Sequence, residues 1–368
     1  MKRFSLTAAG LIALALLLVL SSCEQKIKVA SVVHPDGSID RSIVLSDADS
    51  DKIDRNIFGA STAKGWETSI EAVQHKGEAD KDSKKKITIS FRKHFASATA
   101  ANAEMNADSD TLFRIRSVFE KRFRWFYTYL TYSDTYISLN HFRKVPQEDY
   151  FTREDYAFIE RLPAEGQSIS RADSLYLSAL NTKIFDQFAT RALFEEYFEV
   201  LVQVAQKNKL GQQWIDKLNR QKEAIYGQIV KKGGDSLEDD FMVTFLVDSM
   251  HAPLSTEVAA ADYKKMSSGL VRRISFVSDA NEGKYSHSVK MPWPVVATNA
   301  DYSIGDTELF WHPPVTKFLL GDYTMYAESR QLNYWALMVS GVVILATVFV
   351  FYKRKTSPTA PLRGGEGG

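Results

Sequence analysis

The sequence has only one cysteine among its 368 residues, so no disulfide can form within the chain. It also lacks an excess of charge of either sign, because 46 Lys and Arg stand against 45 Asp and Glu, for a net charge of +1. A near-neutral chain gives no overall electrostatic reason to bind nucleic acid. Hydrophobic residues make up 45% of the chain and aromatic residues 12%, which excludes collagen-like and wholly disordered proteins.

The first 22 residues have the features of a bacterial export signal. Lys2 and Arg3 provide a positive start, and residues 11–20 form an almost unbroken apolar run. A leucine and two serines then precede Cys23, as in the lipobox motif, whose cysteine thiol receives diacylglycerol. The sequence therefore predicts a signal peptide over residues 1–22 and an acyl anchor (palmitate among its chains) on Cys23. The alternative is a free cysteine after a helical core segment.

A second uncharged stretch, residues 334–352, lies near the other end of the chain. As a helix these residues span about 28 Å, close to the thickness of the hydrocarbon layer of a membrane. Three basic residues follow at once, and the positive-inside rule makes them a cytoplasmic stop signal: Lys353, Arg354 and Lys355. We expect a transmembrane helix over residues 333–352 and a disordered cytoplasmic tail over residues 353–368. A buried core helix is the alternative.

Between these ends, residues 23–144 are strand-rich. A Pro-Asp-Gly-Ser turn at residues 35–38 predicts a hairpin over residues 27–45, because proline and glycine suit the backbone angles of such a turn. Residues 112–139 alternate aromatic with basic side chains, which predicts a half-buried antiparallel pair that turns at residues 132–135. Two more strands and two helices are expected, at residues 66–73, 87–95, 47–58 and 96–106.

The pattern becomes helical over residues 145–252, where we expect three to five helices. Strand-like segments return within residues 253–332 and are expected at residues 270–277, 285–291 and 323–329. Because these later strands can complete the first sheet, the predicted fold class is α+β: an antiparallel β-sheet domain with a large helical insertion, plus one C-terminal transmembrane helix. Two tandem domains are the alternative.

Two segments carry a resemblance to a known family. A strand, the Pro-Asp-Gly-Ser turn and a second strand follow the lipobox cysteine, and the other segment runs from a turn at Met291 through Trp311 to residues 326–329. In these features, about a third of the chain, the sequence resembles the LppM-type extracytoplasmic lipoprotein domain. The resemblance implies a small α+β domain without an assigned enzymatic activity, and envelope glycolipids as ligands. Trp293 and Pro294 depart from it, because a Pro-Gly turn is usual there.

The sequence shows no complete motif for catalysis or metal binding. Its seven histidines have neither His-x-x-x-His nor His-Glu-x-x-His spacing, which places two imidazoles on one helix face for zinc. Residues 47–51 begin like a calcium loop, but Lys52 and Phe58 stand where glycine and glutamate are needed. Ser61 and Lys64 have the Ser-x-x-Lys spacing of penicillin-recognising enzymes without the companion motifs. We therefore expect no enzymatic activity, no cofactor and no metal.

Two sets of side chains are candidate binding sites. Four arginines alternate with aromatic residues and suit anionic lipid headgroups: Arg114, Arg116, Arg122 and Arg124. Five aromatic residues of the helical segment share one broad face and suit an acyl chain or a partner helix: Phe185, Phe188, Phe194, Tyr197 and Phe198. The alternatives are a solvated cationic sheet face for the first set and core packing for the second.

Together, the two anchors predict a protein of the bacterial cytoplasmic (inner) membrane with its ectodomain outside the cytoplasm. The leading hypothesis is a lipoprotein with a non-enzymatic binding or scaffolding role at the cell envelope. Its expected partners are the membrane and envelope proteins or lipids, with no nucleic acid. A lipid- or glycolipid-binding protein is the second hypothesis, and an envelope hydrolase whose residues meet only in space is the third.

Overall fold

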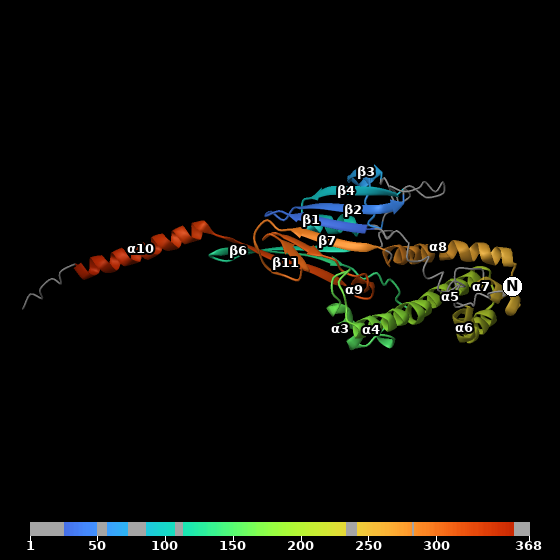
Figure 1. The fold of residues 1–368 in the computed structure, drawn as a ribbon. Coiled ribbons are helices and arrows are strands. Elements are labelled where there is room, and N and C mark those ends of the chain that lie inside the picture. The colour runs from blue at the N-terminus through green and yellow to red at the C-terminus, as the bar shows by residue number, and fades with distance from the viewer. Residues whose placement is uncertain are drawn as a thin grey trace, which may run out of the picture.

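A computed structural model describes residues 26–49, 57–72, 86–106, 113–232, 241–281 and 283–356. Two β-sheets lie face to face, a block of helices adjoins one end of them, and a single long helix leaves from the other end (Figure 1). This arrangement confirms the predicted α+β class with a large helical insertion. The expected signal peptide, Cys23 and residues 357–368 lie outside the described residues.

The larger sheet combines strands from before and after the helical block. Its seven strands have the order β3 (Glu67–Ala72), β4 (Lys86–Phe95), β2 (Ile39–Asp49), β1 (Lys26–Val33), β7 (Lys284–Lys290), β10 (Glu308–Trp311) and β9 (Tyr302–Ile304). The central pair, β1 and β7, is parallel, whereas the expected sheet was wholly antiparallel. A parallel neighbour requires a long crossover connection, and the helical block provides it.

The predicted β1–β2 hairpin is confirmed, but the helix expected at residues 47–58 is wrong at its start. Strand β2 continues to Asp49, and residues 50–56 lie outside the described residues. The helix expected at residues 96–106 is present as α2 (Ala98–Met105), with the Ser97 side chain accepting from the N–H of Ala100. A serine at this position satisfies one of the free N–H groups at the helix start.

The smaller sheet has four strands, in the order β5 (Ile115–Phe123), β6 (Tyr127–Tyr136), β11 (Tyr323–Leu332) and β8 (Val295–Thr298). The turn predicted at residues 132–135 is wrong, because these residues lie inside β6 and the strands connect at residues 124–126. Ile115 pairs with Tyr136, so an odd position of β5 shares its face with an even position of β6. The even-numbered residues of β6 therefore face the core, and Tyr127 and Tyr129 lie on the other face of the sheet.

The helical block contains α3 (Arg153–Arg161), α4 (Arg171–Thr182), α5 (Thr190–Lys207), α6 (Gln212–Lys232), α7 (Phe241–Thr244) and α8 (Thr256–Asn281), with π-helical turns at Lys183–Ala189 and Phe245–Ser249. The strand predicted at residues 270–277 is wrong, since it lies inside α8. Periodicity alone does not distinguish a short segment of this kind in a strand from the same segment inside a longer helix. The helices thus continue to Asn281, beyond the predicted boundary at residue 252.

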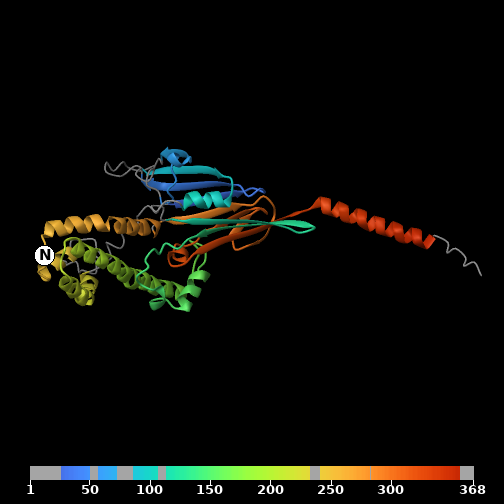
Figure 2. The same ribbon diagram turned by 180° about the vertical axis from the view of Figure 1, so that it is seen from behind.

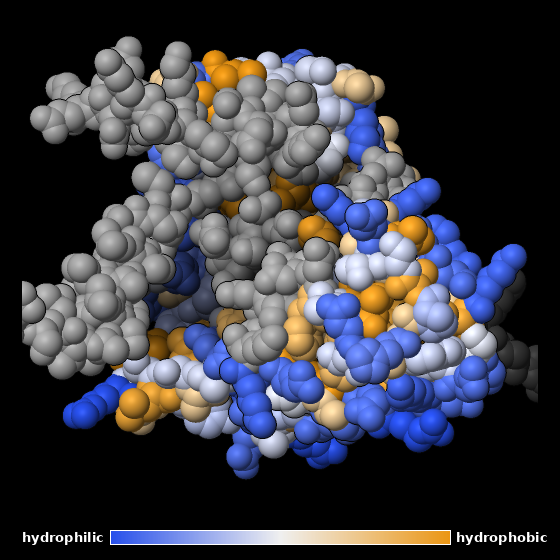
Figure 3. Space-filling model, turned by 90° about the vertical axis from the view of Figure 1, so that its right-hand side faces the viewer, coloured by the Kyte–Doolittle hydropathy of each residue, from blue (hydrophilic) through white to orange (hydrophobic). Residues whose placement is uncertain are grey.

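Helices α5 to α8 enclose a hydrophobic core of their own, whereas the buried residues of α3 and α4 join the core that includes the sheets. Figure 3 views the molecule from this end, where hydrophilic side chains cover much of the visible surface and apolar patches lie between them. Between the sheets, Phe113, Tyr136, Tyr285 and Phe318 pack ring against ring. The ring centroids of Phe113, Tyr285 and Phe318 lie 4.9 to 5.8 Å from one another. The short helix α9 (Thr316–Leu319) contributes Phe318.

The long helix α10 (Tyr334–Thr356) follows directly on β11. Figure 2 shows it, as Figure 1 does, projecting away from the sheets at the end opposite the helical block. Its span Tyr334–Lys355 has a mean hydropathy of 2.2 and is 6% buried, so it is long and apolar enough to cross a membrane. The expected transmembrane segment therefore coincides with an isolated helix rather than with a core helix.

Candidate functional site

Strands β5 and β6 meet in a tight connection, residues 123–126, which we call the hairpin tip. The backbone N–H of Arg124 donates to the carbonyl of Tyr127 at 2.7 Å and closes the turn. Three aromatic side chains of the tip are exposed, Phe123 by 57%, Trp125 by 49% and Phe126 by 44%. Exposed aromatic residues gathered at one end of a sheet are typical of contact with a membrane interface or a partner.

Asn333, the residue before α10, fastens this helix to the hairpin tip. Its side-chain amide donates to the carbonyls of Arg124 (2.8 Å) and Trp125 (3.2 Å), and its amide oxygen accepts from the Thr128 hydroxyl (2.8 Å). Its backbone N–H donates to the carbonyl of Phe126 at 2.8 Å. Four hydrogen bonds therefore hold the start of α10 beside the tip.

Aromatic contacts extend this junction along α10. The Trp335 ring lies 5.9 Å from Phe123 in a stacked arrangement and 5.4 Å from Trp125 edge to face. The indole N–H of Trp125 donates to the Ser340 hydroxyl at 2.9 Å. Ser340 is about 9 Å along the helix axis from the first residue of α10. The tip thus packs beside the first two turns of a helix that has the composition of a membrane span.

The structure divides the four candidate arginines between two places. Arg114 and Arg116 are exposed at the start of β5, and Arg116 lies 3.5 Å from Asp322. Arg122 and Arg124 are exposed at the hairpin tip, about 26 Å further along the strand. Arg122 is paired with a carboxylate, Glu328, at 2.9 Å. A surface at the level of the tip therefore meets Arg122 and Arg124 but not the other two.

The opposite end of α10 carries the predicted stop signal. Lys353, Arg354 and Lys355 are exposed in the last turn of the helix, next to the exposed Tyr352. Aromatic residues thus stand at both ends of the apolar span, with the basic residues at one end only. Such a distribution is typical of a membrane helix whose two ends lie in different compartments.

The aromatic set of the helical block does not form one surface. Phe188, Phe194, Tyr197 and Phe198 are each at most 4% exposed, and they divide between the two hydrophobic cores. Phe185 is exposed and lines a shallow surface hollow with Leu177 and Asn181, among others. Core packing, the alternative considered for this set, describes the four buried residues, and a ligand-binding role for the set stays a prediction.

A buried ionic network lies between the two sheets and was not foreseen in the sequence. The Arg41 guanidinium donates to both carboxylate oxygens of Asp134 at 2.8 Å, and neither side chain is accessible to solvent. His287, also fully buried, places Nε2 3.0 Å from Asp134 Oδ2 and Nδ1 3.0 Å from the hydroxyl of Tyr136. Ser31 and two further hydroxyl groups, those of Ser117 and Tyr132, also donate to this carboxylate.

The pKa shifts of this network follow from burial and from the single positive charge. Burial raises the pKa of the Asp134 carboxyl, but the Arg41 charge and the hydrogen bond from His287 outweigh it and hold that pKa well below its usual range. Burial lowers the pKa of His287, more than the attraction of Asp134 raises it. The network therefore holds one ion pair and a neutral histidine at neutral pH.

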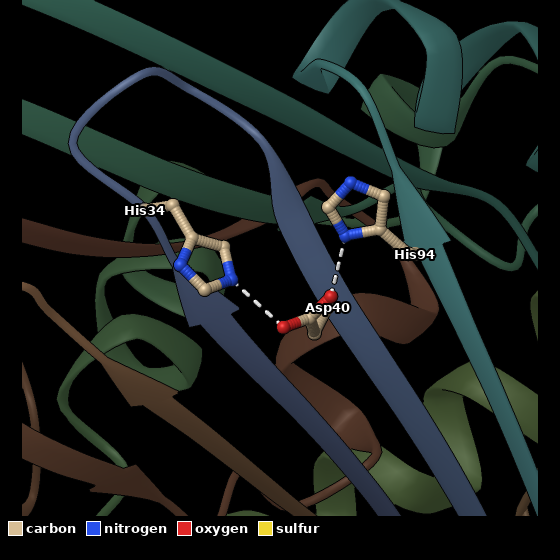
Figure 4. Close-up of side chains that lie close together, drawn as sticks. All are labelled: His34, Asp40 and His94. Carbon is tan, nitrogen blue, oxygen red and sulfur yellow. Dashed lines mark hydrogen bonds and ion pairs between the residues drawn. The ribbon is translucent and has the colours of Figure 1, made fainter.

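A second histidine–aspartate cluster lies on the outer surface of the seven-stranded sheet (Figure 4). His34 Nε2 lies 2.7 Å from Asp40 Oδ2, and His94 Nδ1 lies 2.6 Å from Asp40 Oδ1. Hydrogen bonds from His34 and from His94 lower the pKa of the Asp40 carboxyl. The three side chains are 38%, 49% and 61% exposed for His34, Asp40 and His94. No spacing rule finds this cluster, because it combines three segments that only the sheet brings together.

No protein-family model matches the chain, and no curated protein matches it. Among solved structures, the chain is similar to the folded domain of the Mycobacterium tuberculosis LppM protein, determined by NMR. The match covers 84% of this chain and 91% of that domain, at 9% sequence identity and a TM-score of 0.26. At this score the likeness is weak and concerns the fold alone.

Proposed function

We propose that this protein is a membrane-anchored lipoprotein whose ectodomain is seated on the outer surface of the cytoplasmic membrane and has a non-enzymatic binding or scaffolding role there. One observation carries the proposal: the Trp125 indole N–H donates to Ser340, on the second turn of α10. When α10 spans a membrane, its first turn lies at the interface and its second turn enters the edge of the hydrocarbon layer, so the hairpin tip beside them lies at this boundary.

The residues of the tip have the chemistry of an interface. Trp125, Phe123 and Phe126 offer apolar rings of the kind that gather at membrane–water boundaries. Arg122 and Arg124 lie beside these rings, at the level of lipid phosphates. Arg122 already pairs with Glu328, so Arg124 is the side chain that we assign to an anionic headgroup.

Strand β1 begins at the end of the sheets opposite the hairpin tip, so a lipid on Cys23 would be tethered near that end. Ile27 pairs with Tyr285, whose ring packs against Tyr136 at the end of β6 far from the hairpin tip. The strand β6 is about 33 Å long, whereas the three peptide links from Cys23 to Lys26 span at most about 11 Å. A doubly anchored protein therefore lies with its sheets along the membrane surface, while a protein held by α10 alone can stand upright.

Fluorescence quenching in vesicles tests the seating of the tip. The full-length protein is reconstituted in vesicles with lipids brominated near the headgroup, and tryptophan quenching is compared between the parent, Trp125→Phe and Trp214→Phe. Loss of Trp125 is expected to remove a quenched component, and loss of Trp214, in the helical block, is not. Equal effects of the two substitutions would overturn the proposal.

The arginine assignment has a matched control within the same strand. Quenching in vesicles with anionic lipid is expected to exceed that in neutral vesicles, and Arg124→Gln should remove the difference. Arg114→Gln removes the same charge at the far end of β5 and should leave the difference in quenching between anionic and neutral vesicles unchanged. If both variants behave alike, the arginines act through net charge and not through contact of the tip with headgroups.

A further inference from the structure

The surface cluster of His34, Asp40 and His94 makes none of the contacts described above between the hairpin tip and α10. We propose that it is a binding site for a divalent transition-metal ion such as Zn²⁺, a site that goes beyond the proposed function and does not depend on it. One nitrogen of each histidine and one oxygen of Asp40 lie within 4.8 Å of one another. Imidazole nitrogen and carboxylate oxygen are ordinary ligands of Zn²⁺, at about 2.0–2.2 Å.

The ligands come from elements whose positions the backbone determines. His94 lies directly opposite Asp40 in the β2–β4 ladder, and Asp40 pairs with Val32 of β1. His34 follows β1 in the turn, where its N–H donates to the carbonyl of Ser38 at 3.0 Å. A site built on paired strands needs little rearrangement to close on an ion, which lowers the cost of binding.

The turn that carries His34 requires glycine at position 37. Gly37 has a φ of +94°, and a Cβ there would lie 2.9 Å from a ring carbon of Phe119. The carbonyl of His34 accepts from the N–H of Gly37 at 3.0 Å. The position of the His34 ring therefore depends on a close fit between the two sheets, although the ring itself is at the surface.

The charge around the cluster favours a cation. Asp36 lines a surface hollow together with His34 and Asp40, and its carboxylate accepts hydrogen bonds from the backbone N–H and the hydroxyl of Ser38. Asp36 and Asp40 together bring two negative charges to the hollow. The ammonium of Lys121 donates to the carbonyl of Pro35 at 2.9 Å and is a positive charge near them.

Without metal, Asp40 holds both rings by hydrogen bonds from His34 Nε2 and His94 Nδ1. For metal binding, each of these nitrogens must present a lone pair, so in the neutral ring the proton moves to the other nitrogen. A doubly protonated ring must release a proton to solvent. Three protein ligands leave a fourth tetrahedral position for water. Zinc ions and protons therefore compete for the same nitrogen atoms.

Zinc titration of the full-length protein tests the site. The protein, in detergent and with a purification tag that lacks histidine, is stripped with EDTA and titrated with ZnCl₂ by calorimetry at pH 7.5. We expect one Zn²⁺ per chain. Titration with CoCl₂ should give the visible absorption of a tetrahedral site.

Substitutions distinguish this site from adventitious histidine binding. His94→Ala and Asp40→Asn should each weaken zinc binding by about tenfold or more. His312→Ala is the matched control, because His312 is a partly exposed histidine with an aspartate, Asp301, at 4.0 Å, and it should leave the affinity unchanged. Absence of binding to the parent protein, or equal effects of all three variants, would overturn the proposal. Circular dichroism confirms that each variant is folded.

Discussion

Two histidine–aspartate clusters lie on opposite faces of one strand. Asp40 and Arg41 are neighbours in β2, so their side chains point to opposite sides of the sheet. Arg41 enters the fully buried network with Asp134 and His287, whereas Asp40 holds His34 and His94 at the surface. Both clusters pair histidine with aspartate, but the buried one also contains an arginine, and their access to solvent differs completely.

The comparison shows how solvent access changes the role of the same groups. In the buried cluster, Asp134 accepts hydrogen bonds from the groups around it, because a buried charge without partners costs several kcal/mol. In the surface cluster, water satisfies the remaining lone pairs and an ion can enter. The buried cluster therefore joins the two sheets, and the surface cluster is free to bind a ligand.

The largest expected effect comes from breaking the buried ion pair. Asp134→Asn leaves the Arg41 charge buried without its counter-ion and should lower the free energy of unfolding by about 3–5 kcal/mol. Urea unfolding of the full-length protein in detergent, followed by circular dichroism, measures it. Asp40→Asn, the equivalent change at the surface, should cost under about 1 kcal/mol. Similar costs for the two variants would contradict the assigned difference between the clusters.

The second effect concerns pH. His287 is neutral when folded because burial lowers its pKa, whereas in the unfolded chain it binds a proton near its ordinary pKa of 6.5. The unfolded state thus takes up more protons below pH 6.5, so stability should fall as pH falls through that value. Urea midpoints between pH 8 and pH 5 test this. His287→Gln should flatten the dependence of stability on pH between pH 8 and pH 5. An unchanged pH dependence would contradict the assignment of this effect to His287.

The sequence predicts individual helices and strands better than it predicts the contacts between them. Hairpin, helix and membrane-span patterns are local, and β1–β2, α2 and α10 follow them. The turn predicted at residues 132–135 is wrong, because these residues lie inside β6, where Asp134 and its even-numbered neighbours face the core. A polar residue on that face gives no signal until Arg41, 93 positions away, is known to oppose it.

Both clusters were missed for the same reason. His34, Asp40 and His94 come together only through the register of the β1–β2–β4 ladder, and His287 reaches Asp134 only after the chain has passed through the helical block. Spacing rules detect ligands that share a helix or a loop. Clusters between strands depend on long-range pairing, which one sequence does not specify.

The third effect links the surface cluster to the packing of the sheets. Gly37→Ala forces a side chain into the left-handed region and against Phe119, and should lower the free energy of unfolding by about 1–3 kcal/mol. Because it displaces the turn that carries His34, it should also weaken zinc binding without removing a ligand. The calorimetric titration and urea unfolding measure the two effects. Gly305→Ala is the control, since its φ is also positive (+60°) but its Cβ meets no atom within 4 Å.

The smallest expected effect is the loss of a surface ligand in the absence of metal. His94→Ala removes one hydrogen bond from a side chain that is 61% exposed, so the EDTA-treated protein should lose at most about 1 kcal/mol of stability. With saturating Zn²⁺ the parent should gain stability by mass action, and the variant should gain little of it. Urea midpoints with and without zinc separate these contributions. If the variant and the parent gain equally, zinc stabilises the fold at some other place, and the functional contrast between the two clusters is lost.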